Sequence, residues 1–156
     1  MEKQITAIKS FQVDHDKILP GIYVSRIDGD ILTLDLRTRK PNCGDYMDNV
    51  TMHTTEHMFA TYIRNSDIGD RVIYFGPMGC RTGFYLLLRD SNIEEAVKYV
   101  KETLTLIVNH TGEVFGATQK ECGNYRELDL ECAKKECALY LSNLEKFNKT
   151  DGKYDD

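Results

Sequence analysis

The segment from Thr51 to Arg64 constrains the fold of this 156-residue chain more than any other feature. It contains the pentapeptide His53-Thr54-Thr55-Glu56-His57, and no proline or glycine interrupts it. Residues four apart lie one turn from each other on the same face of a helix, so a helix lets both imidazoles reach one metal ion. The segment therefore predicts a helix over residues 52–64, with Thr51 as its N-cap, that carries two metal ligands.

A glutamate within the same pentapeptide adds an acid or base beside the expected metal. Glu56 precedes His57 by one position, close enough to reach a molecule bound at the metal without itself being a ligand. The order His-x-x-Glu-His is the inverse of the common zinc-peptidase motif and is known as the inverzincin arrangement. A helix that carries two exposed histidines and a solvated glutamate by chance remains an alternative, because short motifs also occur without function.

Five cysteines provide the remaining candidates for a metal site, because His15 and His110 have no ligand spacing. The odd number of cysteines and the lack of a secretory signal or a membrane-spanning run predict free thiols in a reducing cytoplasm. Cys132 and Cys137 fall within a helical pattern and are expected to pack. Cys43 is a loop thiol with no predicted role.

Two cysteines have surroundings that indicate more than packing. Cys80 follows the turn Gly76-Pro77-Met78-Gly79, and the neighbouring Arg81 favours the thiolate that acts as nucleophile or base. Cys122 precedes Gly123, which allows the backbone to turn a thiolate inward. A small buried hydrophobe is the alternative interpretation for each of them.

The pattern along the chain favours an α+β fold in which helices pack on one face of an antiparallel sheet, because tight turns join neighbouring strands. The predicted strands are 21–25, 31–36, 72–75 and 84–88, and the predicted helices are 52–64, 93–108 and 128–146. The second helix begins with Ser91-x-x-Glu94, a capping-box signature. No repeat or linker divides residues 1–156, so we expect a single domain whose polar tail, residues 149–156, is frayed.

The charge and the hydropathy of the chain argue against two classes of partner. The formal net charge is −5 at pH 7, and no basic stripe is present that would release counterions from phosphate, so we expect no nucleic acid partner. No apolar run is long enough to span a bilayer, so we expect no membrane partner either.

The motifs occur in an order that resembles the S-ribosylhomocysteine lyase (LuxS) family, which makes the precursor of the autoinducer-2 signal. The resemblance covers nearly the whole chain, and its specificity comes from the ordered combination of pieces. These pieces are Ser10-Phe11, Asp14-His15, Leu34-Asp35-Leu36-Arg37, His53 to His57, Tyr62-Ile63-Arg64-Asn65, Pro77 to Tyr85 and Cys122-Gly123-Asn124-Tyr125.

The resemblance implies a metal-dependent carbon–sulfur lyase. Such an enzyme moves a carbonyl along the ribose of S-ribosylhomocysteine and then eliminates L-homocysteine, leaving 4,5-dihydroxypentane-2,3-dione. It implies one ferrous ion per subunit, with zinc or cobalt as substitutes, on His53, His57 and Cys122. Glu56 and Cys80 match the acid/base pair of the family. The substrate-pocket positions, some of which reach across a homodimer interface, match Ser10, Phe11, His15, Arg37 and Arg64.

The chain departs from the family pattern just before Cys80. Relatives often have an acidic residue shortly before Ser-Pro-Met-Gly-Cys, whereas this chain reads Tyr74-Phe75-Gly76-Pro77. A substrate contact made by that acidic side chain would be missing here, although a backbone contact would survive.

Two other functions remain open on the sequence. Peptidases of the pitrilysin type share His-x-x-Glu-His and typically use a distal glutamate as third ligand, for which Glu94, Glu95 or Glu102 can be nominated. Those peptidases need much longer chains, and the two singled-out cysteines would then have no role. The second alternative is a non-catalytic metal-binding or signalling module, which is favoured only by the departure before Cys80.

Overall fold

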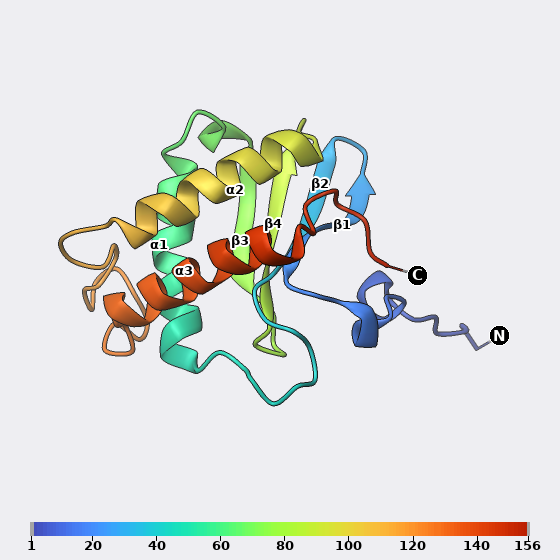
Figure 1. Cartoon of the computed structure of the whole chain (residues 1–156), viewed down its shortest axis with the longest axis horizontal. Coiled ribbons are helices and arrows are strands. Elements are labelled where there is room, and N and C mark those ends of the chain that lie inside the picture. The colour runs from blue at the N-terminus through green and yellow to red at the C-terminus, as the bar shows by residue number, and fades with distance from the viewer. Residues whose placement is uncertain (1, 156) are drawn as a thin grey trace.

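A four-stranded antiparallel sheet forms one layer of the molecule, and three long helices cover one of its faces (Figure 1). The computed structural model describes residues 2–155. The strands lie in the order β1-β2-β4-β3. Their bounds are Gly21–Asp28 for β1, Ile31–Arg37 for β2, Val72–Pro77 for β3 and Gly83–Arg89 for β4. The helices are α1 (Asn49–Arg64), α2 (Ile93–Val108) and α3 (Leu130–Phe147).

The predicted α+β arrangement is confirmed, and side-chain alternation along the strands explains it. Successive residues of a strand point to opposite faces, so β2 directs Leu32, Leu34 and Leu36 toward the helices. The antiparallel register pairs these leucines with apolar residues of β4, for example Leu34 with Leu86. The helices bury their own apolar faces against this surface, and one continuous core results.

Two helix N-caps differ from the sequence-based prediction, and α1 also begins earlier than predicted. Helix α1 begins at Asn49, and the N-cap is Asp48, whose side chain accepts a hydrogen bond from the Thr51 amide at 2.8 Å. Thr51 is therefore the residue that is capped, because its amide is one of the free donors of the first turn. Helix α2 is capped by Asn92 rather than by Ser91, whose hydroxyl donates to a carboxylate oxygen of Glu95 at 2.7 Å.

The described part of the C-terminal tail, for which we expect fraying over residues 149–156, is hydrogen-bonded to β1. The amide of Ile22 donates to the Lys149 carbonyl, and the amide of Val24 donates to the Gly152 carbonyl, each at 2.8 Å. The physical reason is that β1 is an edge strand with free amides, and the tail supplies their acceptors. Asp156 lies outside the described residues.

Within residues 2–155, no helix has both the length and the apolar character that crossing a membrane requires.

Candidate metal centre and active site

Three side chains that the sequence singled out converge beside α1. His53 and His57 lie one turn apart on this helix, and Cys122 comes from the loop between α2 and α3. The Cys122 Sγ lies 3.3 Å from the Nε2 of His53 and 3.7 Å from the Nε2 of His57. A tetrahedral ion with typical metal–nitrogen and metal–sulfur bonds would separate such ligand atoms by about 3.6 Å. The cluster therefore fits a divalent ion.

Backbone carbonyls fix which nitrogen of each imidazole faces the cluster. The Nδ1 of His53 lies 3.0 Å from the Glu127 carbonyl oxygen, and the Nδ1 of His57 lies 2.8 Å from the Phe115 carbonyl oxygen. A carbonyl only accepts, so each Nδ1 carries the proton and each Nε2 keeps its lone pair. This is the arrangement that protein metal sites use to orient histidine ligands.

The sulfur of the cluster is also prepared for a cation. The amide of Asn124 donates to the Cys122 Sγ at 3.4 Å. A donor aimed at sulfur stabilises the thiolate, which is the form that binds metal. Two neutral imidazoles and one thiolate form a donor set that suits iron, cobalt or zinc.

The remaining acidic candidates have different positions. Glu56 is half-buried on α1, one position before the ligand candidate His57. Glu95, nominated as a peptidase-type ligand, is paired with Arg71 at 2.7 Å. In the described part of the chain, the side chains that could together hold an ion are His53, His57 and Cys122. Glu94, Glu95 and Glu102 are not among them. The geometry thus favours cysteine as the third ligand.

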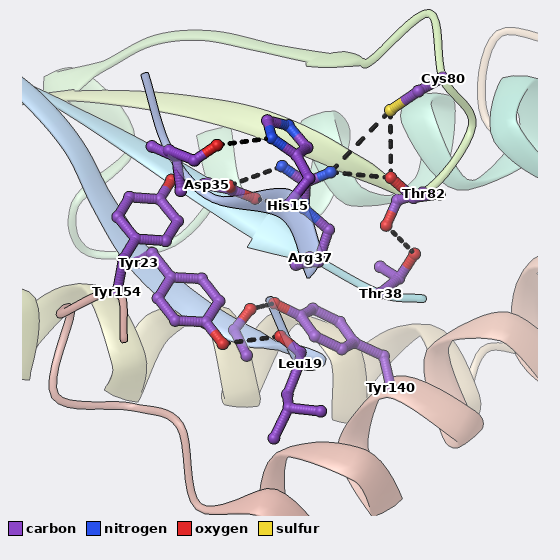
Figure 2. A network of polar contacts seen from close by, with 12 residues as sticks. His15, Leu19, Tyr23, Asp35, Arg37, Thr38, Cys80, Thr82, Tyr140 and Tyr154 are labelled. Carbon is purple, nitrogen blue, oxygen red and sulfur yellow. Dashed lines mark hydrogen bonds and ion pairs between the residues drawn. The ribbon is translucent and has the colours of Figure 1, made fainter. Parts of the chain in front are cut away.

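The second singled-out thiol, Cys80, lies in the turn between β3 and β4 and is exposed. Its sulfur is 3.0 Å from the Thr82 hydroxyl and 3.9 Å from the Nη1 of Arg37 (Figure 2). Arg37 is 3% exposed, and its guanidinium also donates to Thr82 at 2.8 Å. The cation close to this thiol is therefore Arg37, whereas the sequence had indicated the neighbouring Arg81.

A buried carboxylate holds the Arg37 guanidinium in place. Asp35 is 2% exposed, and its two oxygens accept from the Nε and Nη2 of Arg37 at 3.1 and 2.8 Å. Burial opposes the charge of Arg37, but the charge and hydrogen bonds of Asp35 outweigh it and raise the pKa of the guanidinium. The pair forms because residues two apart on a strand share a face.

The predicted substrate residues are only partly brought together. Ser10, His15 and Arg37 line one cavity with Asp35. Its free volume is about 10 Å³, room for roughly one water molecule. Phe11 is 74% exposed instead. A single chain therefore does not form a closed pocket of substrate size from these residues.

The fifth predicted substrate residue, Arg64, lies at the other end of α1 from its N-cap. Its guanidinium donates to the carbonyls of Val72 and Ile73 at 3.2 and 3.0 Å. Two of its N–H groups are thereby held by the backbone of β3, which fixes the direction of the side chain and leaves it exposed.

Tyr74 and Gly76, in the segment before Cys80 that departs from the family pattern, constrain each other. A Cβ atom at Gly76 would lie 2.0 Å from the Tyr74 hydroxyl, because both residues face the same side of β3. The tyrosine at 74, as placed, and any side chain at 76 exclude each other. Tyr74 is 52% exposed, so the change alters the surface next to the turn rather than the core.

Three contributors to the thiol network were not predicted. Asp35 does carry a sequence signal, because its charge and that of the predicted residue Arg37 interrupt an apolar run at strand spacing. Thr82 has no distinctive signal of its own. Tyr154 donates to Asp35 at 2.7 Å from a position 119 residues away, and nothing local in the sequence predicts this contact.

The fold and the two-histidine, one-cysteine cluster define an α+β metalloprotein of the inverzincin type. The S-ribosylhomocysteinase (LuxS) family model matches residues 8–151. A protein named S-ribosylhomocysteine lyase from Borreliella burgdorferi (strain ZS7) is 42% identical over 153 residues, covering 94% of this chain and 98% of that protein. Proteins of the same name from Finegoldia magna and Phocaeicola vulgatus are 44% and 45% identical, covering 91% and 88% of this chain and 94% and 89% of those proteins. This chain belongs to the S-ribosylhomocysteinase (LuxS) family, which confirms the resemblance seen in the sequence.

Proposed function

We propose that this chain is an S-ribosylhomocysteine lyase that releases L-homocysteine and 4,5-dihydroxypentane-2,3-dione. The observation that carries the proposal is the convergence of His53, His57 and Cys122 on one point, in a member of this family. An exposed thiol, Cys80, lies beside a fixed cation and supplies a second reactive group.

The reaction needs groups that move protons next to carbonyls. The thioether of S-ribosylhomocysteine lies too far from the aldehyde carbon for direct elimination. The carbonyl must first migrate along the ribose chain until it is β to the sulfur. Each step of this migration removes a proton beside a carbonyl and returns one to a neighbouring carbon, and the final step expels the homocysteine thiolate.

The metal site supplies the electrophilic part of this chemistry. His53, His57 and Cys122 would hold one divalent ion per subunit, and two neutral ligands with one thiolate leave the ion a net positive charge. When bound, the ion is a Lewis acid for the substrate carbonyl. We assign ferrous iron as the native metal, with zinc and cobalt as substitutes that the same donor set accepts.

Cys80 is assigned as the base that takes and returns protons on carbon. Its exposure gives the substrate access, and the Arg37 guanidinium lies 3.9 Å from its sulfur. The Thr82 hydroxyl, at 3.0 Å, holds the sulfur in a fixed direction. Positioning of this kind is required of a general base.

Glu56 is assigned to proton transfer among the substrate oxygens and to the final elimination. It precedes His57 by one position on α1, so its carboxylate lies beside the cluster and not in it. Its side chain is only partly buried, which leaves the carboxylate accessible to a bound molecule.

The substrate pocket is assigned to Ser10, Phe11, His15, Arg37 and Arg64 in a homodimer. The small cavity at Ser10 and His15 has no room for substrate, so a second copy of the chain would complete the pocket. Ile5, Ile8 and Phe11 are 93%, 59% and 74% exposed, and apolar side chains exposed together fit a protein interface. We place the enzyme in the cytoplasm, where a reducing environment keeps its five free cysteines as thiols.

Product analysis tests the proposed function. The protein is loaded with Fe²⁺ without oxygen and incubated with S-ribosylhomocysteine. Homocysteine is then separated by chromatography, because the thiols of the protein would interfere with a bulk thiol assay. We expect homocysteine and the dione in equal amounts. Absence of both products from metal-loaded protein would contradict the proposal, and peptide cleavage under the same conditions would replace it.

A further inference from the structure

We propose that Tyr154, in the segment after α3, is a positioning residue for the Cys80 thiol. Its hydroxyl would hold Asp35, and through Asp35 the Arg37 guanidinium, in the arrangement that keeps the thiol next to a cation. The inference rests on the proton-transfer role assigned to Cys80 in the proposed function.

Figure 2 shows the line of contacts from the tail to the thiol. The Tyr154 hydroxyl donates to the Oδ2 of Asp35 at 2.7 Å, and the same oxygen accepts from the Nη2 of Arg37 at 2.8 Å. The Nη1 of Arg37 then donates to the Thr82 hydroxyl at 2.8 Å and lies 3.9 Å from the Cys80 sulfur. Tyr154 is thus three contacts from the thiol and touches no part of it.

The position of the tail is specified by several contacts, so Tyr154 does not reach Asp35 by chance. Tyr154 stacks on Tyr23, with ring centroids 4.6 Å apart and planes within 5° of parallel. Gly152 has a positive φ of 80°, and a Cβ there would lie 3.0 Å from atoms of Ile93 and Val24. The backbone at 152 therefore fits against the body of the protein only as glycine.

Burial makes the Asp35–Arg37 pair sensitive to a single donor. Both side chains are withdrawn from water, so each oxygen of Asp35 relies on protein donors. Burial, followed by the charge and hydrogen bond of Asp35, raises the pKa of the Tyr154 phenol, which keeps it a donor at physiological pH. The family match ends at residue 151, so this donor lies beyond the segment that the family model describes.

The charged and titratable groups around the thiol set the direction of the expected effect. Arg37 faces Cys80 from β2, with Asp35 behind it, and Arg81 adjoins it in the turn. The phenol of Tyr85 faces Asp35 and Arg37 from β4. His15, in the N-terminal segment, lines the small cavity that Asp35 and Arg37 also line. Without the Tyr154 hydroxyl, more of the charge of Asp35 is left to draw Arg37 back and to oppose a thiolate at 80.

The test compares Tyr154→Phe with the unaltered, metal-loaded protein. The phenylalanine keeps the ring that stacks on Tyr23 and removes only the hydroxyl. Alkylation of Cys80 by iodoacetamide is followed from pH 6 to 10 by peptide mapping, which separates Cys80 from the other thiols. We expect alkylation of Cys80 at pH 7 to slow about threefold, because the thiol loses part of its contact with the cation. We also expect kcat to fall about threefold with KM unchanged.

Tyr99→Phe is the matched control, because Tyr99 is a half-buried tyrosine of α2 remote from the network. Its Cys80 profile should superimpose on that of the unaltered protein. Superimposable profiles for Tyr154→Phe as well, in a protein with an unchanged unfolding midpoint, would overturn the proposal. Alkylation needs no substrate, so the two proposals can fail separately. If the unaltered, metal-loaded protein had no lyase activity but Tyr154→Phe still changed the alkylation profile of Cys80, the proposed function would be refuted and the positioning role would stand.

Discussion

The two regions that carry the candidate chemistry are held in place by different forces. At the metal cluster, two ligands come from one turn of α1, and backbone carbonyls orient both imidazoles. Around Cys80, side chains from a turn, a strand and the tail meet, and a buried ion pair orients them. The first region thus depends on where the backbone runs, whereas the second depends on which charges are buried together.

Cys122→Ser should have the largest effect, and it acts on the metal cluster alone. Removing the thiolate ligand should lower metal affinity more than about 100-fold, because loss of an outer partner of a ligand already costs that much. Elemental analysis of the purified protein measures the bound metal. Cys43→Ser, at an exposed loop thiol, is the control and should keep its metal. Full metal occupancy in Cys122→Ser would exclude Cys122 as a ligand.

Asp35→Asn should have the next largest effect, and it acts on the thiol region. It leaves the Arg37 guanidinium buried without a counter-charge, which costs about 3–5 kcal/mol of unfolding free energy. Urea unfolding measures this loss. The control is Asp28→Asn, since Arg26–Asp28 on β1 has the same spacing but lies in water. Its unfolding midpoint should not change measurably. Equal effects of the two substitutions would show that burial of the Asp35–Arg37 pair has no energetic importance.

Asp48→Ala should have a smaller effect on the helix that carries the metal ligands. Loss of the N-cap costs about 1 kcal/mol. The hydrogen bond from the Thr51 side chain, followed by that from the Thr51 amide, lowers the pKa of Asp48 from its ordinary 3.8. The stabilisation is therefore present above pH 3.8 and lost as the pH falls through the lower folded-state pKa.

Urea unfolding at pH 7 and at pH 3 measures the difference between Asp48→Ala and the unaltered protein. Asn92→Ala removes the neutral cap of α2, so its effect should not titrate in this range. A difference for Asp48→Ala that stayed constant with pH would show that the charge of Asp48 does not contribute.

Tyr23→Phe should have the smallest effect near neutral pH and a visible one in alkali. Burial, partly opposed by the hydrogen bond to the Leu19 carbonyl, raises the pKa of Tyr23 from 10.0 to about 12. The neutral phenol therefore stabilises the fold fully below pH 10, and this contribution is lost as the pH rises through 12. Stability of Tyr23→Phe should fall less steeply over that interval, as measured by urea unfolding. Identical slopes would contradict the assignment.

The same difference between the regions explains what the sequence could predict. Strands and helices follow from alternation and period, and the His53–His57 pair follows from one turn of helix, so local patterns were sufficient. The tail is polar, and no local pattern shows that its carbonyls satisfy the free amides of β1. The Asp48 cap was missed because a neighbouring threonine is also a good cap residue. Tyr154 was missed because its role exists only when residues 35 and 154 meet in the fold.

Cys80→Ala tests most directly whether metal binding and proton transfer on carbon reside in separate regions. Metal content and homocysteine release from S-ribosylhomocysteine are measured on the same anaerobic preparation. We expect Cys80→Ala to keep the metal content of the unaltered protein and to release homocysteine about 10²–10⁴-fold more slowly, which is the usual contribution of a general base. Turnover close to that of the unaltered protein, at equal metal content, would contradict the account.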